Sequence, residues 1–186
     1  MEWTSCAKHI EPISDEWMNL ARERLDNLTK PIRSLGLLED IAARVVAIRE
    51  EAMPPMPKKV VFVFAGDHGV ATDGVSPYPQ EVTGLMVKTF LAGRAGINVL
   101  ARAAGAKVNI IDIGMKTDIG EDTALIRRNI RRGTRNLAEG PAMTREETEA
   151  ALNVGVEMAG SAYEEGVGLL ATGEMGIGNT TPSTAL

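Results

Sequence analysis

The sequence predicts an α/β fold in which helices flank a parallel sheet. Three short apolar runs, at residues 59–64, 107–113 and 167–171, have the length and composition of buried strands. Between them lie segments whose apolar residues recur every three or four positions, as in amphipathic helices. Because parallel strands need crossover connections, this alternation indicates right-handed strand–helix–strand units.

The composition is that of a soluble globular protein with one sizeable core. The chain has 186 residues, of which 44% are hydrophobic and 24% are charged. Its net charge of -5 disfavours nucleic acids and membrane surfaces as partners. Cys6 is the only cysteine, which excludes an internal disulfide and a cysteine-based zinc cage. With no visible secretory signal or membrane-spanning run, we expect a cytoplasmic protein.

The N-terminal region predicts two helices before the first strand. Residues 14–28 fit an amphipathic helix with Ser14 as its N-cap, and residues 37–52 fit a second one. A proline-rich run at residues 54–57 ends the second helix and marks a boundary. The two predicted parts are a helical region at 1–53 and an α/β domain at 58–186.

The elements of the α/β part follow from caps, breaks and apolar runs. Thr144 and Glu147 have the spacing of a capping box, and Pro182 fits the first position of a helix. The last helix would make only about one turn before Leu186, so we expect a truncated chain. In order, we predict a strand at 59–64, helices at about 80–92 and up to Gly105, a strand at 107–113, a helix at 144–163, a strand at 167–171 and a helix from Thr181.

Three loops after the predicted strands lie at the sheet edge where open parallel sheets bind ligands. They begin at Ala65, Gly114 and Gly173. The third is the most suggestive, because glycines allow close approach of a ligand and a helix N-terminus presents free amide donors. Asn179, Thr180 and Thr181 would add side-chain donors for a phosphate, or serve equally well as ordinary helix caps. The third loop matches neither the phosphate-loop lysine motif nor the dinucleotide glycine fingerprint.

Other polar residues in these loops admit two interpretations. Asp67 and His68 suit a metal or acid–base site, but with only two histidines in the chain a hydrogen-bonded structural pair is favoured. Glu174 would accept hydrogen bonds from a ribose or a base, or cap the next helix. Met175 and Tyr78 would form the wall of a slot for a flat ring, or fill gaps in the packing.

An arginine cluster precedes the predicted helix at 144–163. Such a cluster would meet phosphate, but it is more often a solvated face, which we favour here. Its members are Arg127, Arg128, Arg131, Arg132 and Arg135.

Three strings, FAGDHGV at 64–70, GVSPYPQEVT at 74–83 and GEMGIGNTT at 173–181, closely resemble the nicotinate-nucleotide–dimethylbenzimidazole phosphoribosyltransferase family. RRGTRN at 131–136 and PAMT at 141–144 are similar to the same family. The likeness spans nearly the whole chain, and the order of several long strings makes it specific.

The resemblance implies transfer of phosphoribose from nicotinate mononucleotide to 5,6-dimethylbenzimidazole. The products would be α-ribazole 5′-phosphate, which supplies the lower ligand of cobalamin, and nicotinate. The family's architecture implies a Rossmann-like large domain, a small helical domain that includes residues 1–53, and a homodimer. It implies small-molecule substrates and neither a cofactor nor a metal.

The resemblance also implies site residues. The family's catalytic base is a glutamate near the C-terminus of a chain about twice this long, so we expect these 186 residues to lack it and to have little transferase activity. At position 85 a glutamine is common in the family, and Leu85 puts any hydrogen bond from that position in doubt. The implied substrate contacts are Gly176, Gly178, Asn179 and Thr180 at the phosphoribosyl end, Glu174 and Met175 near the bases, and Ser76 and Tyr78 at the benzimidazole pocket.

Two other classes of function stay open from the residues alone. A nucleotide-binding module would keep the third loop but carry out no chemistry. A metal-dependent hydrolase would be centred on Asp67 and His68, and the poverty of further ligands disfavours it.

Overall fold

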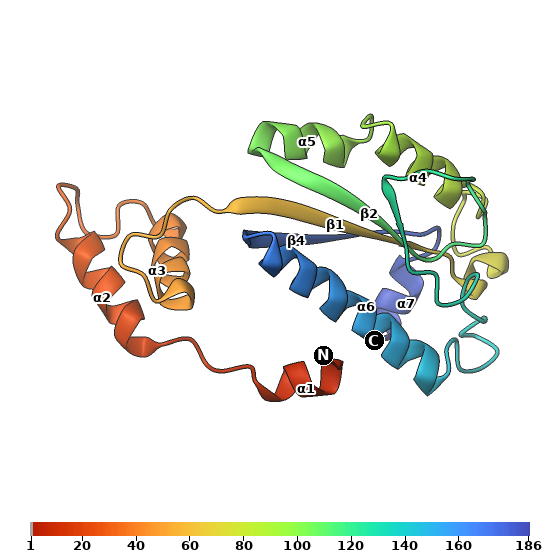
Figure 1. Ribbon diagram of the computed structural model, residues 1–186, viewed down its shortest axis with the longest axis horizontal. Helices are drawn as coiled ribbons and strands as arrows, with labels where there is room; N and C mark the ends of the chain where they lie inside the picture. The colour runs from red at the N-terminus through yellow and green to blue at the C-terminus, as the bar shows by residue number, and fades with distance from the viewer. Residues whose placement is uncertain (1) are drawn as a thin grey trace. The chain divides into compact units, whose positions relative to one another are not determined.

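The computed structural model describes residues 2–186, and the chain divides into two compact units (Figure 1). Of the described residues, 2–6 and Pro57–Leu186 form the sheet unit, and Ala7–Met56 form the helical unit. The first residues therefore group with the sheet and not with the predicted helical region. A contact of the helix α1 (Trp3–Lys8) contributes to this, because the Trp3 N–H donates to Asn153 Oδ1 at 2.8 Å.

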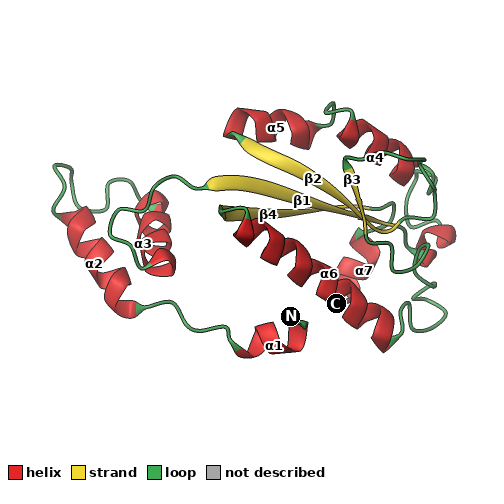
Figure 2. Cartoon of the chain, in the orientation of Figure 1, coloured by secondary structure: helices red, strands yellow, loops and turns green. Residues whose placement is uncertain are grey.

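The sheet has four parallel strands in the order β3-β2-β1-β4 (Figure 2). The three predicted strands are confirmed as β1 (Lys58–Gly66), β2 (Ala106–Gly114) and β4 (Val167–Met175). The sequence did not predict β3 (Leu125–Arg127), which has only three residues.

Helices cover both faces of the sheet, so the α/β prediction is confirmed (Figure 1). Alternate residues of β1 define the two sides. Val61 and Val63 face a core cluster with α4 (Val82–Leu91), whereas Val60 and Phe62 face one with α6 (Arg145–Glu164). The remaining helical elements of this unit are η1 (Gly69–Asp73), α5 (Gly96–Ala104) and α7 (Thr180–Ala185).

The helical unit contains α2 (Asp15–Asp26) and α3 (Leu37–Arg49). The predicted N-cap is confirmed, because Ser14 Oγ accepts a hydrogen bond from the Trp17 N–H at 3.4 Å. Ala21, Ala43 and Val46 form a small buried core. Within residues 2–186, no helix combines the length and the hydropathy needed to cross a membrane.

The predicted capping box at the start of α6 is confirmed. Thr144 Oγ1 accepts from the Glu147 N–H at 3.2 Å, and Glu147 Oε2 accepts from the Thr144 N–H at 2.8 Å. Arg135 Nη1 also lies 2.7 Å from Glu147 Oε2. Hydrogen bonds from Arg135 and from the Thr144 backbone lower the pKa of Glu147 from 4.5 to about 2. The carboxylate thus ties the arginine-rich loop to the helix.

We expect the Glu147→Gln variant to lose less stability in acid than the wild-type protein does. The carboxylate stabilises the folded state fully above pH 4.5, and this contribution disappears as the pH falls towards 2. Thermal unfolding measured between pH 6 and pH 2.5 should therefore give a smaller decrease in Tm for the variant. Glu149→Gln is the control, since it breaks only an exposed pair with Arg145. An equally steep decrease in Glu147→Gln would contradict the prediction.

Candidate functional site

The first and third loops meet beyond the ends of β1 and β4. His68 Nε2 lies 2.6 Å from Asn179 Oδ1, and the Ile177 N–H donates to Thr83 Oγ1 at 3.1 Å. Thr83 is fully buried at the start of α4. Two hydrogen bonds between residues far apart in sequence therefore fix the third loop on the first loop and on the start of α4.

The second loop joins them through Lys116. The Lys116 N–H donates to Asp67 Oδ2 at 2.8 Å, and Lys116 Nζ donates to Gln80 Oε1 at 2.8 Å. Gln80 Nε2 in turn donates to the His68 carbonyl oxygen at 2.8 Å. All three predicted loops therefore form one hydrogen-bonded cluster at the carboxyl edge of the sheet.

The third loop is shorter than predicted. Gly173, Glu174 and Met175 belong to β4, because their backbone continues the ladder with Val63–Ala65 of β1. The turn proper starts at Gly176, where a Cβ would lie closer than 3.0 Å to the Gly66 carbonyl oxygen and to Asn179 Oδ1. Gly178 has a φ of +84°, a left-handed conformation that favours glycine.

Asn179 precedes α7, but its side chain does not cap the helix. The capping interpretation of Asn179 is therefore wrong. Its Oδ1 is bound to His68 instead, and its Nδ2 donates to no residue within 2–186. Pro182 lies at the third position of α7, not at the predicted first position.

Glu174 and Met175 differ in their surroundings at the end of β4. Glu174 is exposed, and no residue in the range 2–186 donates a hydrogen bond to its carboxylate. Glu174 therefore does not cap α7, and the interpretation that it caps the next helix is wrong. Met175 is half-buried and packs against the core cluster that contains Val63 and Val87.

Ser76 and Tyr78 lie in the first loop. Ser76 Oγ accepts a hydrogen bond from the Tyr78 N–H at 3.2 Å, which closes a local turn. The Tyr78 side chain is 65% exposed, so it does not fill a gap in the packing. Its place beside a substrate stays a prediction.

Asp67 and His68 do not form the predicted hydrogen-bonded pair. Each is held by a distant partner, Lys116 for Asp67 and Asn179 for His68. The Asp67 side chain is buried, and its Oδ1 has no partner among the described residues. An orphan buried oxygen costs stability and is typical of functional positions. Within residues 2–186 no three His, Cys, Asp or Glu side chains are grouped so that they could hold a metal ion.

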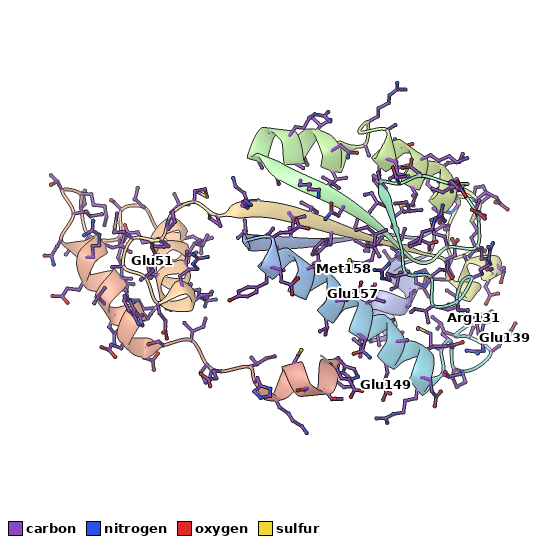
Figure 3. All side chains as sticks on the ribbon, in the orientation of Figure 1. Glu51, Arg131, Glu139, Glu149, Glu157 and Met158 are labelled. Carbon is purple, nitrogen blue, oxygen red and sulfur yellow. The ribbon has the colours of Figure 1, made fainter. Side chains whose placement is uncertain are left out.

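The arginine cluster is an exposed face paired with carboxylates. Arg128 contacts Glu157 of α6, and this hydrogen bond lowers the pKa of Glu157. Arg131 and Arg135 both contact Glu147. Figure 3 shows Arg131 on its loop and Glu157 on α6. The solvated-face interpretation is the one that these contacts support.

Sequence reasoning missed two residues of the site. Thr83 lies in one of the strings that carry the family resemblance, but its position in a predicted helix hid its role as a buried acceptor. Lys116 lies two positions after the end of β2, and this position at the carboxyl edge of the sheet could have identified it as a site residue.

Comparisons with known proteins agree with this architecture. Residues 10–186 match the family model described as Phosphoribosyltransferase. A nicotinate-nucleotide–dimethylbenzimidazole phosphoribosyltransferase from Geobacter sulfurreducens is 57% identical over 183 residues, which cover 98% of this chain and 52% of the relative. The protein of that name from Geobacter sp. strain M21 is 52% identical over 182 residues, again 98% of this chain and 52% of the relative.

A solved structure gives the same result. The crystal structure of the phosphoribosyltransferase of that name from Thermus thermophilus superposes with a TM-score of 0.89 at 48% identity, over 93% of this chain and 52% of the other. The chain spans about half the length of the curated relatives it matches. It therefore belongs to the nicotinate-nucleotide–dimethylbenzimidazole phosphoribosyltransferase family.

Proposed function

We propose that this protein takes part in phosphoribosyl transfer from nicotinate mononucleotide to 5,6-dimethylbenzimidazole, giving α-ribazole 5′-phosphate and nicotinate for the lower ligand of cobalamin. The observation that carries the proposal is the turn at 176–179, where Asn179 keeps an unpaired amide donor although its oxygen is bound. The names of the relatives supply the two substrates.

The turn after β4 would bind the phosphoribosyl group. Gly176 and Gly178 are half-buried and shape the turn, while Asn179 Nδ2 and the Thr180 hydroxyl would donate to oxygen atoms of the phosphate. Lys116 Nζ, held by Gln80, would place a positive charge at the same edge of the sheet. A phosphate dianion can thus be bound by a protein with a net charge of -5.

The bases would lie next to the strand end. Glu174 is an exposed acceptor for a ribose hydroxyl or a ring N–H, and Met175 would contact a ring face. Ser76 and Tyr78 would border the benzimidazole. In the reaction a benzimidazole nitrogen forms a bond to the ribose anomeric carbon as the bond to nicotinate breaks, and the other ring nitrogen loses its proton to a base.

We infer that the general base lies in polypeptide outside these 186 residues, so that the chain alone turns over little substrate. On the basis of the family we also propose a homodimer, a cytoplasmic location, and a small domain to which residues 1–53 contribute. A non-catalytic nucleotide-binding module is the alternative, since it would need only the turn.

Calorimetric titration of the 186-residue chain tests the binding step. We expect nicotinate mononucleotide to bind with a Kd of about 1 mM or tighter, and nicotinic acid riboside, which lacks the phosphate, to bind at least about tenfold more weakly. Equal affinities for the two ligands would show that the turn does not hold phosphate.

A turnover assay separates the enzyme from the module. Only β1 pairs with β4 within residues 2–186, and Leu169 and Leu170 on β4 are 50% and 44% exposed. An exposed apolar edge strand of this kind is suited to pair with a further strand. We expect nicotinate release to rise when the chain is mixed with the C-terminal half of the Geobacter sulfurreducens relative. Binding without release in that mixture would favour the module.

A further inference from the structure

We propose that His68 is a positioning residue that orients the Asn179 amide for the phosphoribosyl group. The proposal rests on the proposed function of the turn at 176–179. In this arrangement the His68 ring holds the amide by its oxygen, and the two N–H groups on Asn179 Nδ2 remain for the substrate.

The contact between the two side chains defines the proton positions. His68 Nε2 lies 2.6 Å from Asn179 Oδ1. Because an amide oxygen only accepts hydrogen bonds, this orientation of Asn179 requires a proton on His68 Nε2. The opposite amide orientation would place an N–H against this nitrogen and would require a proton on Nδ1. One tautomer therefore corresponds to one orientation of Asn179.

The backbone on both sides of His68 is fixed. The Asp67 N–H donates to the Gly114 carbonyl at 3.0 Å, and the Asp67 carbonyl accepts from the Thr134 N–H at 2.9 Å. After His68, the Gly69 N–H donates to Thr134 Oγ1 at 3.2 Å. The backbone of His68 is thus fixed, and its ring contacts the glycine-containing turn through Asn179.

The sequence after Asn179 leaves its oxygen available to His68. An asparagine at the N-cap of a helix ordinarily accepts from the second or third helical N–H. Here the third position is Pro182, which has no N–H, and the Thr181 N–H already donates to the Gly178 carbonyl at 3.0 Å. The usual capping partners are therefore absent or occupied, and the imidazole takes the oxygen.

Without His68 the amide would rotate and present its oxygen to the phosphate for part of the time. A carbonyl oxygen against an anion is repulsive, so the affinity must decrease although Asn179 is still present. The role of His68 is therefore exerted through Asn179 and not by contact with the substrate.

Calorimetry with nicotinate mononucleotide and four variants tests this dependence. We expect His68→Ala and Asn179→Ala each to weaken binding about tenfold, and the double variant to be no weaker than Asn179→Ala alone. His68→Gln, which can place an amide N–H near the same oxygen, should recover most of the affinity. Additive effects of the two alanine substitutions, in variants with unchanged circular dichroism, would overturn the proposal.

Nitrogen-15 NMR provides a test that needs no ligand. The ring nitrogens of His68 at pH 8 should have the shifts of the Nε2–H tautomer, and the side-chain amide signal of Asn179 should move in His68→Ala. An Nδ1–H tautomer, or an unmoved amide signal, would overturn the orientation. If wild type shows the expected tautomer but does not bind the mononucleotide, the proposed function fails while the hydrogen bond stands.

Discussion

Replacing Gly176 with alanine is expected to abolish measurable binding of nicotinate mononucleotide and to destabilise the protein by about 2–3 kcal/mol. An added Cβ would lie closer than 3.0 Å to the Gly66 carbonyl oxygen and to Asn179 Oδ1. The first is backbone at the end of β1 and cannot move without disturbing the strand. The second is the oxygen that His68 holds, so the amide would be displaced from the proposed phosphate site.

The matched control is Gly160→Ala. Gly160 lies in α6, where nothing occupies the space within 4 Å of an added Cβ. Alanine there should stabilise the helix by roughly 0.5–1 kcal/mol and leave ligand affinity unchanged. Urea unfolding and calorimetry on both variants check the pair. Wild-type affinity in Gly176→Ala would mean that the turn is not where the nucleotide binds.

The sheet of this protein could be predicted from strands such as β1, which is a continuous apolar run from Val60 to Ala65. Such runs are typical of parallel strands buried on both faces, and Val60 to Val63 are indeed buried. The short strand β3 could not be predicted, since its three residues are below the length at which periodicity is visible. Its identity as a strand depends on pairing with Ile110–Asp112 of β2.

The exposure of β4 also depends on tertiary structure. Both β1 and β4 contain apolar residues in succession, yet β1 lies between two strands and β4 lies at the edge. An apolar run predicts a strand, but it does not predict how many neighbouring strands pair with it. The end of β4 was misplaced for a related reason, because pairing with β1 keeps Gly173 extended where its composition suggested a turn.

The location of the site could be predicted from the sequence, but the hydrogen-bond partners of its residues could not. Parallel topology brings the three loops to one edge of the sheet, which the order of elements already implies. Adjacent residues of an extended backbone point in opposite directions, and His68 has φ -115° and ψ 132°. Asp67 and His68 therefore find different partners. Asn179, 111 positions away from His68, could be identified only from the fold.

Asp112→Ala is expected to lower the free energy of unfolding by about 3 kcal/mol, more than the usual effect of one substitution. Asp112 is 5% exposed at the end of β2. Its Oδ1 accepts from the Gly114 N–H at 3.0 Å, from the Met115 N–H at 2.8 Å and from Asn129 Nδ2 at 3.1 Å. Alanine would leave the buried Gly114 and Met115 N–H groups without an acceptor, whereas Asn129 Nδ2 would keep the Met115 carbonyl oxygen at 3.1 Å.

Asp112→Asn separates the loss of the acceptor from the loss of charge. It keeps one oxygen for the Gly114 and Met115 N–H groups, so we expect a cost of about 1 kcal/mol. Thermal unfolding should give a Tm roughly 6–12 °C lower for Asp112→Ala and a clearly smaller decrease for Asp112→Asn. Equal decreases would indicate that charge, and not the acceptor, is what β2 requires.

The effect of Asp112→Ala should extend to the ligand. Met115, which Asp112 fixes, precedes Lys116, and the Lys116 N–H is the partner of Asp67 beside His68. A second loop released from Asp112 would therefore loosen the backbone that holds the imidazole. We expect weaker mononucleotide binding in Asp112→Ala even at 10 °C, where the variant remains folded. Unchanged affinity there would mean that the first and third loops hold the site without the second.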